Sequence, residues 1–523
     1  MAGVQHDAQV LDSHVHGARL AGTQGLRRRV LLGAALLTGA TGLVGCGKGA
    51  GKNGITPVDG TGGGTATARP PKPPTPPTPL STPTPADWKA LAESLSGKLL
   101  RPGDVGYPVA HQLYDPAYDS VLPAAVAECS DPADVATTLK FAERFKLPLT
   151  GKSGGHSYVG ASTNHGGIVI SVRPLAGVTV DGSTARIGSG TPLKQVYEDL
   201  EAKGRIIPAG SCPSVGVAGL TLGGGLGVLN RAHGLACDVV TQVQVVTADG
   251  KVRLANASAE PELFWACRGG GGGTLGVVTA FWFKTVPSPL VGTFSVRWAW
   301  SDAAAVVRGW QRYLGSAPDS VWPSLRLTAS PGGSQAASVF GLDSANDPGP
   351  QLDRLISAVG VQPDQHSFTR NRRVGPDPDG PRTVFYAGTD ILGTPLTDSG
   401  TSSLLAVMNS RAHGTGLAAT AIFDPLGGAI SRLAVDATAF PWRKAFTSIQ
   451  WYAEQGRATG QVAREWIAAG HQAVAGSAVG GYVNYLEASR PSGKLYFGPN
   501  LDRLRAAKAK YDPTDVFKLP YSL

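Results

Sequence analysis

Three glycine-rich stretches constrain the fold of this chain more than any other feature. They read GKSGGHSYVG at 151–160, AGSCPSVGVAGLTLGGGLG at 209–227 and RGGGGGTLG at 268–276. Glycine lets backbone N–H groups approach a ligand closely, and successive N–H groups form nests that bind anions. Tight turns alone would explain one such stretch. Because there are three, and two of them hold a reactive side chain (His156 and Cys212), we expect them to cradle a pyrophosphate-bearing ligand.

Short apolar runs around these stretches predict a mixed α+β domain. The sequence Ser130-Asp131-Pro132 predicts a helix start with Ser130 as the capping hydroxyl, and apolar residues continue at helical spacing to about Phe145. A second helix is expected over 192–203. The expected strands are 124–128, 147–150, 168–172, 178–180, 185–187, 242–247 and 277–283.

Three familiar motifs fail on context. Gly151-Lys152-Ser153 matches the end of a P-loop, but the first glycine of that motif would fall on Lys146. Residues 271–276 satisfy GxGxxG, yet the β-branched and aromatic run VVTAFWF follows where a dinucleotide-binding turn needs a helix. Residues 151–155 satisfy GxSxG, yet a glycine-rich loop and not a helix follows, so a serine hydrolase has no nucleophile elbow.

Charge and cysteine content exclude other classes. The net charge is +9, but several of the basic residues lie in the N-terminal leader and no basic block is interleaved with aromatics, so we expect no nucleic acid partner. The five cysteines form no CxxC pair, which argues against a metal site. Cys129, Cys237 and Cys267 are expected to be buried small hydrophobic residues.

The N-terminal segment predicts export. Residues 27–45 combine three arginines with an apolar stretch of signal-peptide length, similar to a twin-arginine signal, and Leu43-Val44-Gly45-Cys46 matches a lipobox whose cysteine is lipidated. An uncleaved interfacial anchor is the alternative. Residues 47–86 are rich in Gly, Pro and Thr and read as a linker between membrane and enzyme.

From about residue 110 to the C-terminus, the chain resembles the berberine-bridge-enzyme-like flavin oxidases of the vanillyl-alcohol-oxidase (PCMH-type) superfamily. The resemblance is carried by the segments YDPAYDSVLPAAVAECSDPADV, GKSGGHSYVG, IPAGSCPSVGVAGLTLGGGLGVLNRAHGLACDVV, ELFWACRGGGGGTLGVV, YVNYLE and YFGPNLDRLRAAKAKYDPTDVF. It implies an α+β fold with a two-lobed FAD-binding domain over 87–289, a substrate domain over 290–474 with an antiparallel sheet backed by helices, and a C-terminal segment over 475–523 that returns to the first domain.

The resemblance also implies how FAD is held. In this family the histidine of SGGH is bonded to the flavin 8α-methyl group, and some members bond flavin C6 to the cysteine of a GxCPxVG loop; here these are His156 and Cys212. Val215 takes the position that gates oxygen, and a small valine favours an oxidase. The other expected cofactor-binding residues are Gly151, Lys152, Ser153, Gly154, Gly155, Ser157, Gly210, Gly216, Gly219, Gly223, Gly227, Val278, Asn484 and Asn500.

Oxidation of a C–H bond by a flavin needs a base for the adjacent proton. If YVNYLE forms a strand, Tyr482 and Asn484 share one face. The resemblance favours Tyr482 as the base, with Tyr485 in reserve. Relatives often carry a histidine where this chain has Trp442, which shifts the expected substrate toward an apolar or aromatic one if the side chain faces the pocket. The candidate substrate contacts are Tyr386, Asp390, Trp442, Gln450 and Tyr452.

Three functions remain open on the sequence. The first is an oxidase acting on a small alcohol, sugar or phenolic substrate, with O2 as acceptor and H2O2 as product. The second is a dehydrogenase that uses another electron acceptor, and the third is a flavoprotein without catalysis. Membrane contact is expected only through the lipid anchor at Cys46.

Overall fold

The computed structural model describes residues 82–376, 380–412, 416–454, 460–518, 520–521 and 523, and these belong to one compact unit. The expected signal sequence, the lipobox cysteine Cys46 and nearly all of the linker lie outside the described residues. Among the described residues, no helix has both the length and the apolar character needed to cross a membrane.

The N-terminal part of the unit is the β-α-β arrangement that the sequence predicts. Strands β2 (Ala125–Glu128) and β3 (Leu149–Lys152) both run parallel to β4 (Ile168–Ser171), and β1 (Lys98–Leu100) adds an antiparallel edge to β2. Helix α3 (Pro132–Phe145) connects β2 to β3 and packs against α1 (Pro85–Ser94). Its N-terminus is capped by the carboxylate of Asp131, which accepts from the Asp134 N–H, and not by Ser130 as expected.

A five-stranded antiparallel sheet follows, with the order β5-β6-β10-β8-β9. The second glycine-rich stretch contains a short helix, α5 (Val217–Leu222). Glycine residues at both ends of α5 leave room for close backbone packing around it. The strands are β5 (Val178–Asp181), β6 (Thr184–Gly188), β8 (Val240–Thr247), β9 (Val252–Ala255) and β10 (Gly276–Lys284), the helices are α4 (Leu193–Glu201), α5 (Val217–Leu222), α6 (Asn230–His233) and α7 (Pro261–Ala266), and β7 (Arg205–Ile206) pairs with β11 (Val286–Pro287).

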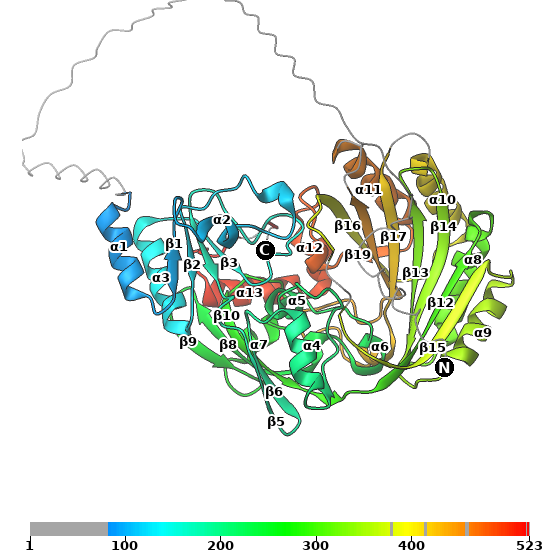
Figure 1. The fold of residues 1–523 in the computed structure, drawn as a ribbon, viewed down its shortest axis with the longest axis horizontal. Coiled ribbons are helices and arrows are strands. Elements are labelled where there is room, and N and C mark those ends of the chain that lie inside the picture. Colours follow the sequence, from blue (N-terminus) through cyan, green and yellow to red (C-terminus); the bar gives the residue numbers. More distant parts are fainter. Residues whose placement is uncertain (1–81, 377–379, 413–415, 455–459, 519, 522) are drawn as a thin grey trace, which may run out of the picture. The chain divides into compact units, whose positions relative to one another are not determined.

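The third sheet has eight antiparallel strands in the order β15-β12-β14-β13-β17-β18-β16-β19. Helices α8–α11 cover one of its faces, and the other face is turned toward α5 and α6 (Figure 1). Along β18, Ile449, Trp451 and Ala453 belong to the core under the helices. The strands are β12 (Leu290–Trp298), β13 (Val321–Ala329), β14 (Gln335–Asp343), β15 (Gln365–Arg373), β16 (Phe385–Leu392), β17 (Ala418–Pro425), β18 (Thr447–Glu454) and β19 (Ala478–Gly480), and the helices are α8 (Ala303–Ser316), α9 (Pro348–Val359), α10 (Asp398–Ala412) and α11 (Gly460–Val474).

The C-terminal segment returns to the first two sheets through α12 (Gly493–Phe497) and α13 (Leu501–Tyr511), and α13 packs against α7. The segment YVNYLE is not a strand. The chain leaves the sheet edge after β19 because the Gly481 N–H donates to Leu495 O, and residues Val483–Tyr485 then form a turn of 3-10 helix.

The predicted α+β fold class is confirmed.

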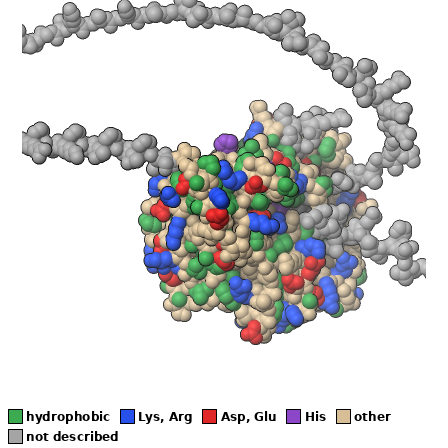
Figure 2. Space-filling view, turned by 60° about the vertical axis from the view of Figure 1, so that its left-hand side comes forward, with side chains coloured by type: hydrophobic (Ala, Val, Ile, Leu, Met, Phe, Trp, Pro, Cys, Tyr) green, Lys and Arg blue, Asp and Glu red, His purple; other side chains and the backbone are tan. Residues whose placement is uncertain are grey.

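On the face seen in Figure 2, basic and acidic side chains are interspersed, and neither sign forms a patch of its own.

Candidate active site

A cavity lies between the glycine-rich stretches and the uncovered face of the eight-stranded sheet. All three glycine-rich stretches contribute to its wall, together with the C-terminal segment 482–486 and side chains from β13, β16, β17 and β18. The cavity therefore joins segments that are far apart in the sequence, with the glycines on one side and aromatic and polar side chains of the large sheet on the other.

The first two glycine-rich stretches touch backbone to backbone. A Cβ atom on Gly154 would lie 2.2 Å from the amide nitrogen of Gly216, and one on Gly216 would lie 2.4 Å from that of Gly154. At Gly219, Gly272 and Gly273, by contrast, a Cβ would meet nothing within 4 Å, although all three line the cavity. At these three glycines the backbone itself borders the cavity. Such a surface can approach the flat ring or the anionic phosphates of a dinucleotide closely.

Lys152 brings a cation to this wall. Its ammonium group donates to the carbonyl oxygens of Ala110 and Gln112. Burial lowers the pKa of Lys152 to about 8, and the nearby charge of Arg173 acts in the same direction. An anionic ligand in the cavity would offset this loss of solvation, which agrees with the phosphate chemistry expected of the cradle.

His156 and Cys212 lie in the same wall. The imidazole of His156 stacks on Tyr114, with ring centroids 4.1 Å apart, and its Nε2 lies 3.0 Å from Ser214 Oγ. Cys212 is half-buried, whereas the other described thiols are buried as expected, and burial raises the pKa of each; they belong to Cys129, Cys237 and Cys267. Cys212 is thus the one described thiol that is open to a ligand in the cavity.

The Tyr482 hydroxyl is held by three donors. It accepts from the backbone N–H groups of Gly225 (2.9 Å) and Leu226 (3.2 Å) and from Asn484 Nδ2 (2.9 Å). Tyr482 and Asn484 do lie together, but through the 3-10 turn and not through a strand. Burial raises the pKa of Tyr482 to about 12, although the three hydrogen bonds oppose this shift. The hydroxyl therefore ties the second glycine-rich stretch to the C-terminal segment.

The Tyr485 hydroxyl has no hydrogen bond to another described residue. Its ring stacks on Tyr158, with centroids 5.4 Å apart and planes 2° apart, and lies edge-on to Tyr482. Burial raises the pKa of Tyr485 well above its usual value, and the charges of Tyr158 and Asp424 add to this effect. The two tyrosines thus differ: Tyr482 is engaged by the protein, while Tyr485 offers its hydroxyl to the cavity.

Asp424 is a functional candidate that no motif predicted. It lies on β17 in the cavity wall, where its carboxylate accepts one hydrogen bond, from Ser324 Oγ at 2.9 Å. Burial raises its pKa, so this carboxylate is poised to accept a proton. The only feature of the sequence that could have indicated Asp424 is the strand-like alternation of side chains along residues 418–425. Other wall residues missed by the sequence reading are Tyr114, Tyr158, Asn230, Trp322, Arg326, Phe385 and Ile422.

The structure brings most of the predicted residues to the cavity. Gln450 Nε2 donates to Tyr158 Oη at 2.7 Å, and Tyr452 stacks on Phe385. Gly223 is not in the wall because the Asn484 amide occupies the space beside it. The predicted residues that line the cavity are Gly151, Lys152, Ser153, Gly154, Gly155, His156, Ser157, Gly210, Cys212, Val215, Gly216, Gly219, Gly227, Val278, Gln450, Tyr452, Tyr482, Asn484 and Tyr485.

Four further predicted residues do not line the cavity. Tyr386 and Asp390 point to the helix-covered face of β16, because side chains alternate along a strand and Phe385 faces the cavity. The Trp442 indole donates to Gly481 O at 2.9 Å, so it supports the backbone before Tyr482 and does not face the pocket. Asn500 donates to the carbonyl groups of Val435 and Thr438 instead of reaching the cofactor side.

Comparisons with known proteins agree with this geometry. Residues 123–256 match the family described as FAD binding domain, and residues 481–523 match the family described as berberine and berberine like. The chain is 30% identical over 449 residues to the uncharacterized FAD-linked oxidoreductase YgaK of Bacillus subtilis, covering 82% of this chain and 97% of that protein.

A xylooligosaccharide oxidase of Thermothelomyces thermophilus is 27% identical over 435 residues, covering 77% of this chain and 87% of that protein. Among solved structures, Physcomitrella patens BBE-like 1 superposes with a TM-score of 0.76 at 26% identity, covering 83% of this chain and 98% of that one.

Proposed function

Because this chain belongs to the berberine-bridge-enzyme-like family of FAD-linked oxidoreductases, we propose that it is an oxidase that removes a hydride from a small organic substrate and passes the electrons to O2, forming H2O2. FAD, when bound, supplies the hydride acceptor. The observation that carries the proposal is that the glycine-rich stretches and Tyr485, whose hydroxyl makes no hydrogen bond to another described residue, line the same cavity.

The substrate class is a molecule with a hydroxyl group next to the oxidised carbon: an alcohol, a sugar or a phenolic compound. Asp424 and Gln450 offer polar contacts, and the rings of Tyr158, Phe385 and Tyr452 offer flat apolar walls. The relatedness to a xylooligosaccharide oxidase supports a sugar as the first class to screen.

We assign the proton-accepting role to Tyr485 together with Asp424. The substrate hydroxyl would donate its proton to the Tyr485 oxygen. Since Tyr485 makes no direct hydrogen bond to Asp424, a bridging water would carry the phenol proton to the Asp424 carboxylate, whose pKa is raised by burial. Tyr482 remains the alternative, since three donors around its oxygen favour the phenolate form. In our assignment Tyr482 instead fixes the glycine loop at Gly225.

Val215, a small side chain in the cavity wall, supports O2 as the acceptor. We expect purified protein to release H2O2 stoichiometrically with substrate in a screen of oligosaccharides, alcohols and phenolics, followed by peroxidase-coupled absorbance. Turnover that requires an added dye and yields no H2O2 would indicate a dehydrogenase. Bound flavin that no candidate substrate reduces would favour a flavoprotein without catalysis.

We also propose that His156 and Cys212 both attach FAD covalently. After acid precipitation, the yellow colour should stay with the protein pellet in the wild type and in Cys212→Ala, and should appear in the supernatant in the His156→Ala Cys212→Ala double variant. Cys267→Ala, which removes a buried thiol outside the cavity wall, is the matched control. Colour released from the wild type would contradict covalent attachment and leave the FAD assignment intact.

The leader supports a further proposal on location. Three arginines, an apolar stretch and the lipobox at Cys46 favour export by the twin-arginine route and anchoring at the cell surface. Insertion of a cofactor in the cytoplasm before export of the folded protein fits that route.

A further inference from the structure

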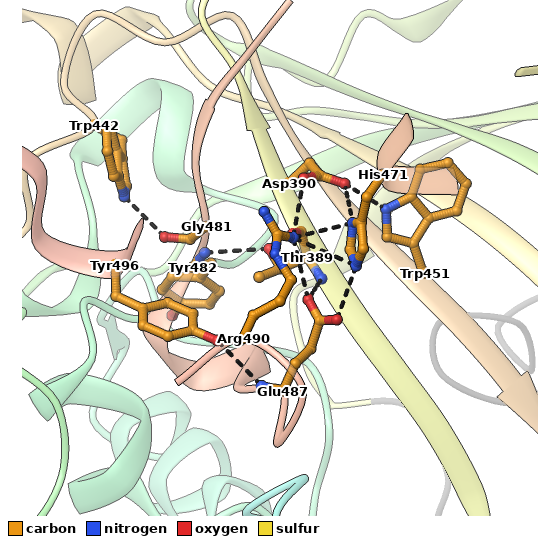
Figure 3. Close-up of polar contacts among 10 residues, drawn as sticks. All are labelled: Thr389, Asp390, Trp442, Trp451, His471, Gly481, Tyr482, Glu487, Arg490 and Tyr496. Atoms are coloured by element: carbon orange, nitrogen blue, oxygen red, sulfur yellow. Dashed lines mark hydrogen bonds and ion pairs between the residues drawn. The ribbon is translucent and has the colours of Figure 1, made fainter. Parts of the chain in front are cut away.

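Behind β16, on the side away from the cavity, four charged side chains form a closed group that we call the carboxylate clamp: Asp390, His471, Glu487 and Arg490 (Figure 3). His471, from α11, bridges two carboxylates, with Nδ1 2.6 Å from Asp390 Oδ2 and Nε2 2.8 Å from Glu487 Oε2. Arg490 Nη1 lies 3.2 Å from Asp390 Oδ1 and 3.4 Å from Glu487 Oε1. None of the four residues lines the cavity.

The geometry of the clamp fits a protonated His471. A neutral imidazole has one N–H donor, whereas both ring nitrogens here face a carboxylate oxygen; only the imidazolium donates to both. Two positive and two negative charges then balance. Two contacts oppose the charge, since Arg490 Nη1 lies 3.0 Å from His471 Nδ1 and 3.4 Å from His471 Nε2. The Asp390 and Glu487 side chains are only 1% and 4% exposed, so removal of the imidazolium would leave two buried carboxylates with Arg490 as their only cation, one negative charge in excess.

The clamp is joined to the active-site segment at Thr389. Thr389 faces Gln450 of β18 on one side of β16, but β19 pairs only with Ile391 and Leu392, so no strand lies beside Thr389 on the other side. Glu487 Oε1 accepts from the Thr389 N–H at 2.9 Å, and Arg490 Nη1 donates to Thr389 O at 2.9 Å. The Thr389 hydroxyl in turn accepts from the Tyr482 N–H at 3.1 Å. Two clamp side chains thus complete the sheet edge to which the Tyr482 backbone is bonded.

Resting on the function proposed above, we propose that His471, as an imidazolium between Asp390 and Glu487, is a positioning residue that holds segment 482–490, and with it the two active-site tyrosines, against the edge of β16. Among the described residues, the other hydrogen bonds from this segment to the rest of the protein lead away from the sheet. The Glu487 N–H donates to Tyr496 Oη of α12 at 3.2 Å, and the side chains of Tyr482 and Asn484 bond to the second glycine-rich stretch. Loss of the imidazolium charge would let Glu487 and Arg490 leave Thr389, and Tyr482 and Tyr485 would shift together.

The clamp predicts a dependence on pH with a definite sign. Burial alone would lower the pKa of His471, but its hydrogen bonds to Asp390 and Glu487 raise it to about 9. The titratable or charged groups that face it are Asp390, Glu487 and Arg490, and Tyr496 adjoins Glu487. Because the folded-state pKa lies above the unfolded value of about 6.5, the contribution of the clamp is complete below that value and is lost as the pH rises through about 9.

The test compares His471→Gln with His366→Gln, which makes the same change at an exposed histidine on β15. We expect His471→Gln to retain bound flavin and to lower kcat about 10- to 100-fold, since a misplacement of about 1 Å can cost 10²-fold. We expect the kcat of the wild type to decline near pH 9 and that of His471→Gln to lack this decline. Glu487→Gln, which keeps the shape and removes one charge, should move that decline to lower pH by at least one unit.

A second readout does not depend on turnover. The difference in melting temperature between wild type and His471→Gln should be largest at pH 6 and should shrink as the pH approaches 10, while His366→Gln shows no such trend. A difference that is constant with pH, or a His471→Gln protein with the kcat and pH profile of the wild type, would overturn the proposal. A wild type that turns over no substrate while the melting-temperature trend is present would contradict the proposed function and retain the clamp.

Discussion

Tyr485→Phe is expected to lower kcat about 10²- to 10⁴-fold, the range that general base catalysis usually contributes. The substitution removes the hydroxyl that faces the cavity without a hydrogen bond to the described protein, and it leaves the stacking on Tyr158 in place. Asp424→Asn should lower kcat as well, because the amide cannot take up the phenol proton. The loss relative to the wild type should be largest at pH values above the Asp424 pKa and should shrink at low pH, where the wild-type carboxylate is itself protonated. The measurement is steady-state peroxide release together with the flavin spectrum of each variant.

Tyr482→Phe is the matched comparison, because it removes the neighbouring hydroxyl. We expect it to release the loop at Gly225 and Leu226, which lose an acceptor for their N–H groups, and so to weaken flavin retention and thermal stability more than the chemical step. A Tyr482→Phe enzyme with intact flavin and no turnover, beside an active Tyr485→Phe enzyme, would transfer the base to Tyr482.

The second large effect is on folding stability. Arg443 is fully buried and makes two hydrogen bonds to Asp238, Nη1–Oδ2 at 2.8 Å and Nη2–Oδ1 at 2.7 Å. Arg443→Leu would leave the Asp238 carboxylate buried without its partner, a change that typically costs about 3–5 kcal/mol. We expect that decrease in the free energy of unfolding in urea, with a lower midpoint.

The pair Arg432–Asp319 provides the control, since both side chains are largely exposed at 61% and 45%. Arg432→Leu should change the free energy of unfolding by no more than about 1 kcal/mol, because solvent screens exposed ion pairs. Equal effects of the two substitutions would mean that Asp238 recovers a partner or water when Arg443 is removed.

The sequence predicted best where periodicity is strong and local. Strands β2, β4, β6, β8 and β10 and helix α3 lie within a few residues of their expected positions, because apolar alternation and a helix start are properties of short windows. The cavity wall on the glycine side could also be predicted. A wall made of backbone without side chains requires glycine, and runs of glycine are visible in the sequence.

The substrate side of the cavity could not be anticipated in the same way. Whether Asp390 or Asp424 faces the cavity depends on which sheet face the helices cover, and that is decided by contacts between distant segments. A one-residue difference in phase on a strand sends a side chain to the opposite face. The segment YVNYLE reads as a strand, yet Glu487 and Arg490 occupy the edge of β16 where that strand would have continued.

The bond from the Tyr482 hydroxyl to the glycine loop has a consequence for biosynthesis. One wall of the cofactor cavity is formed by residues 482–486, and Phe517 and Tyr521 add further contacts; all of these are synthesised after the rest of the wall. Domains generally fold from the N-terminus during synthesis, so the nascent chain would present an incomplete cavity until residues 482–521 have emerged. Flavin incorporation is therefore expected to follow the synthesis of these residues, and a chain truncated before residue 480 should fold its first sheets yet contain no flavin.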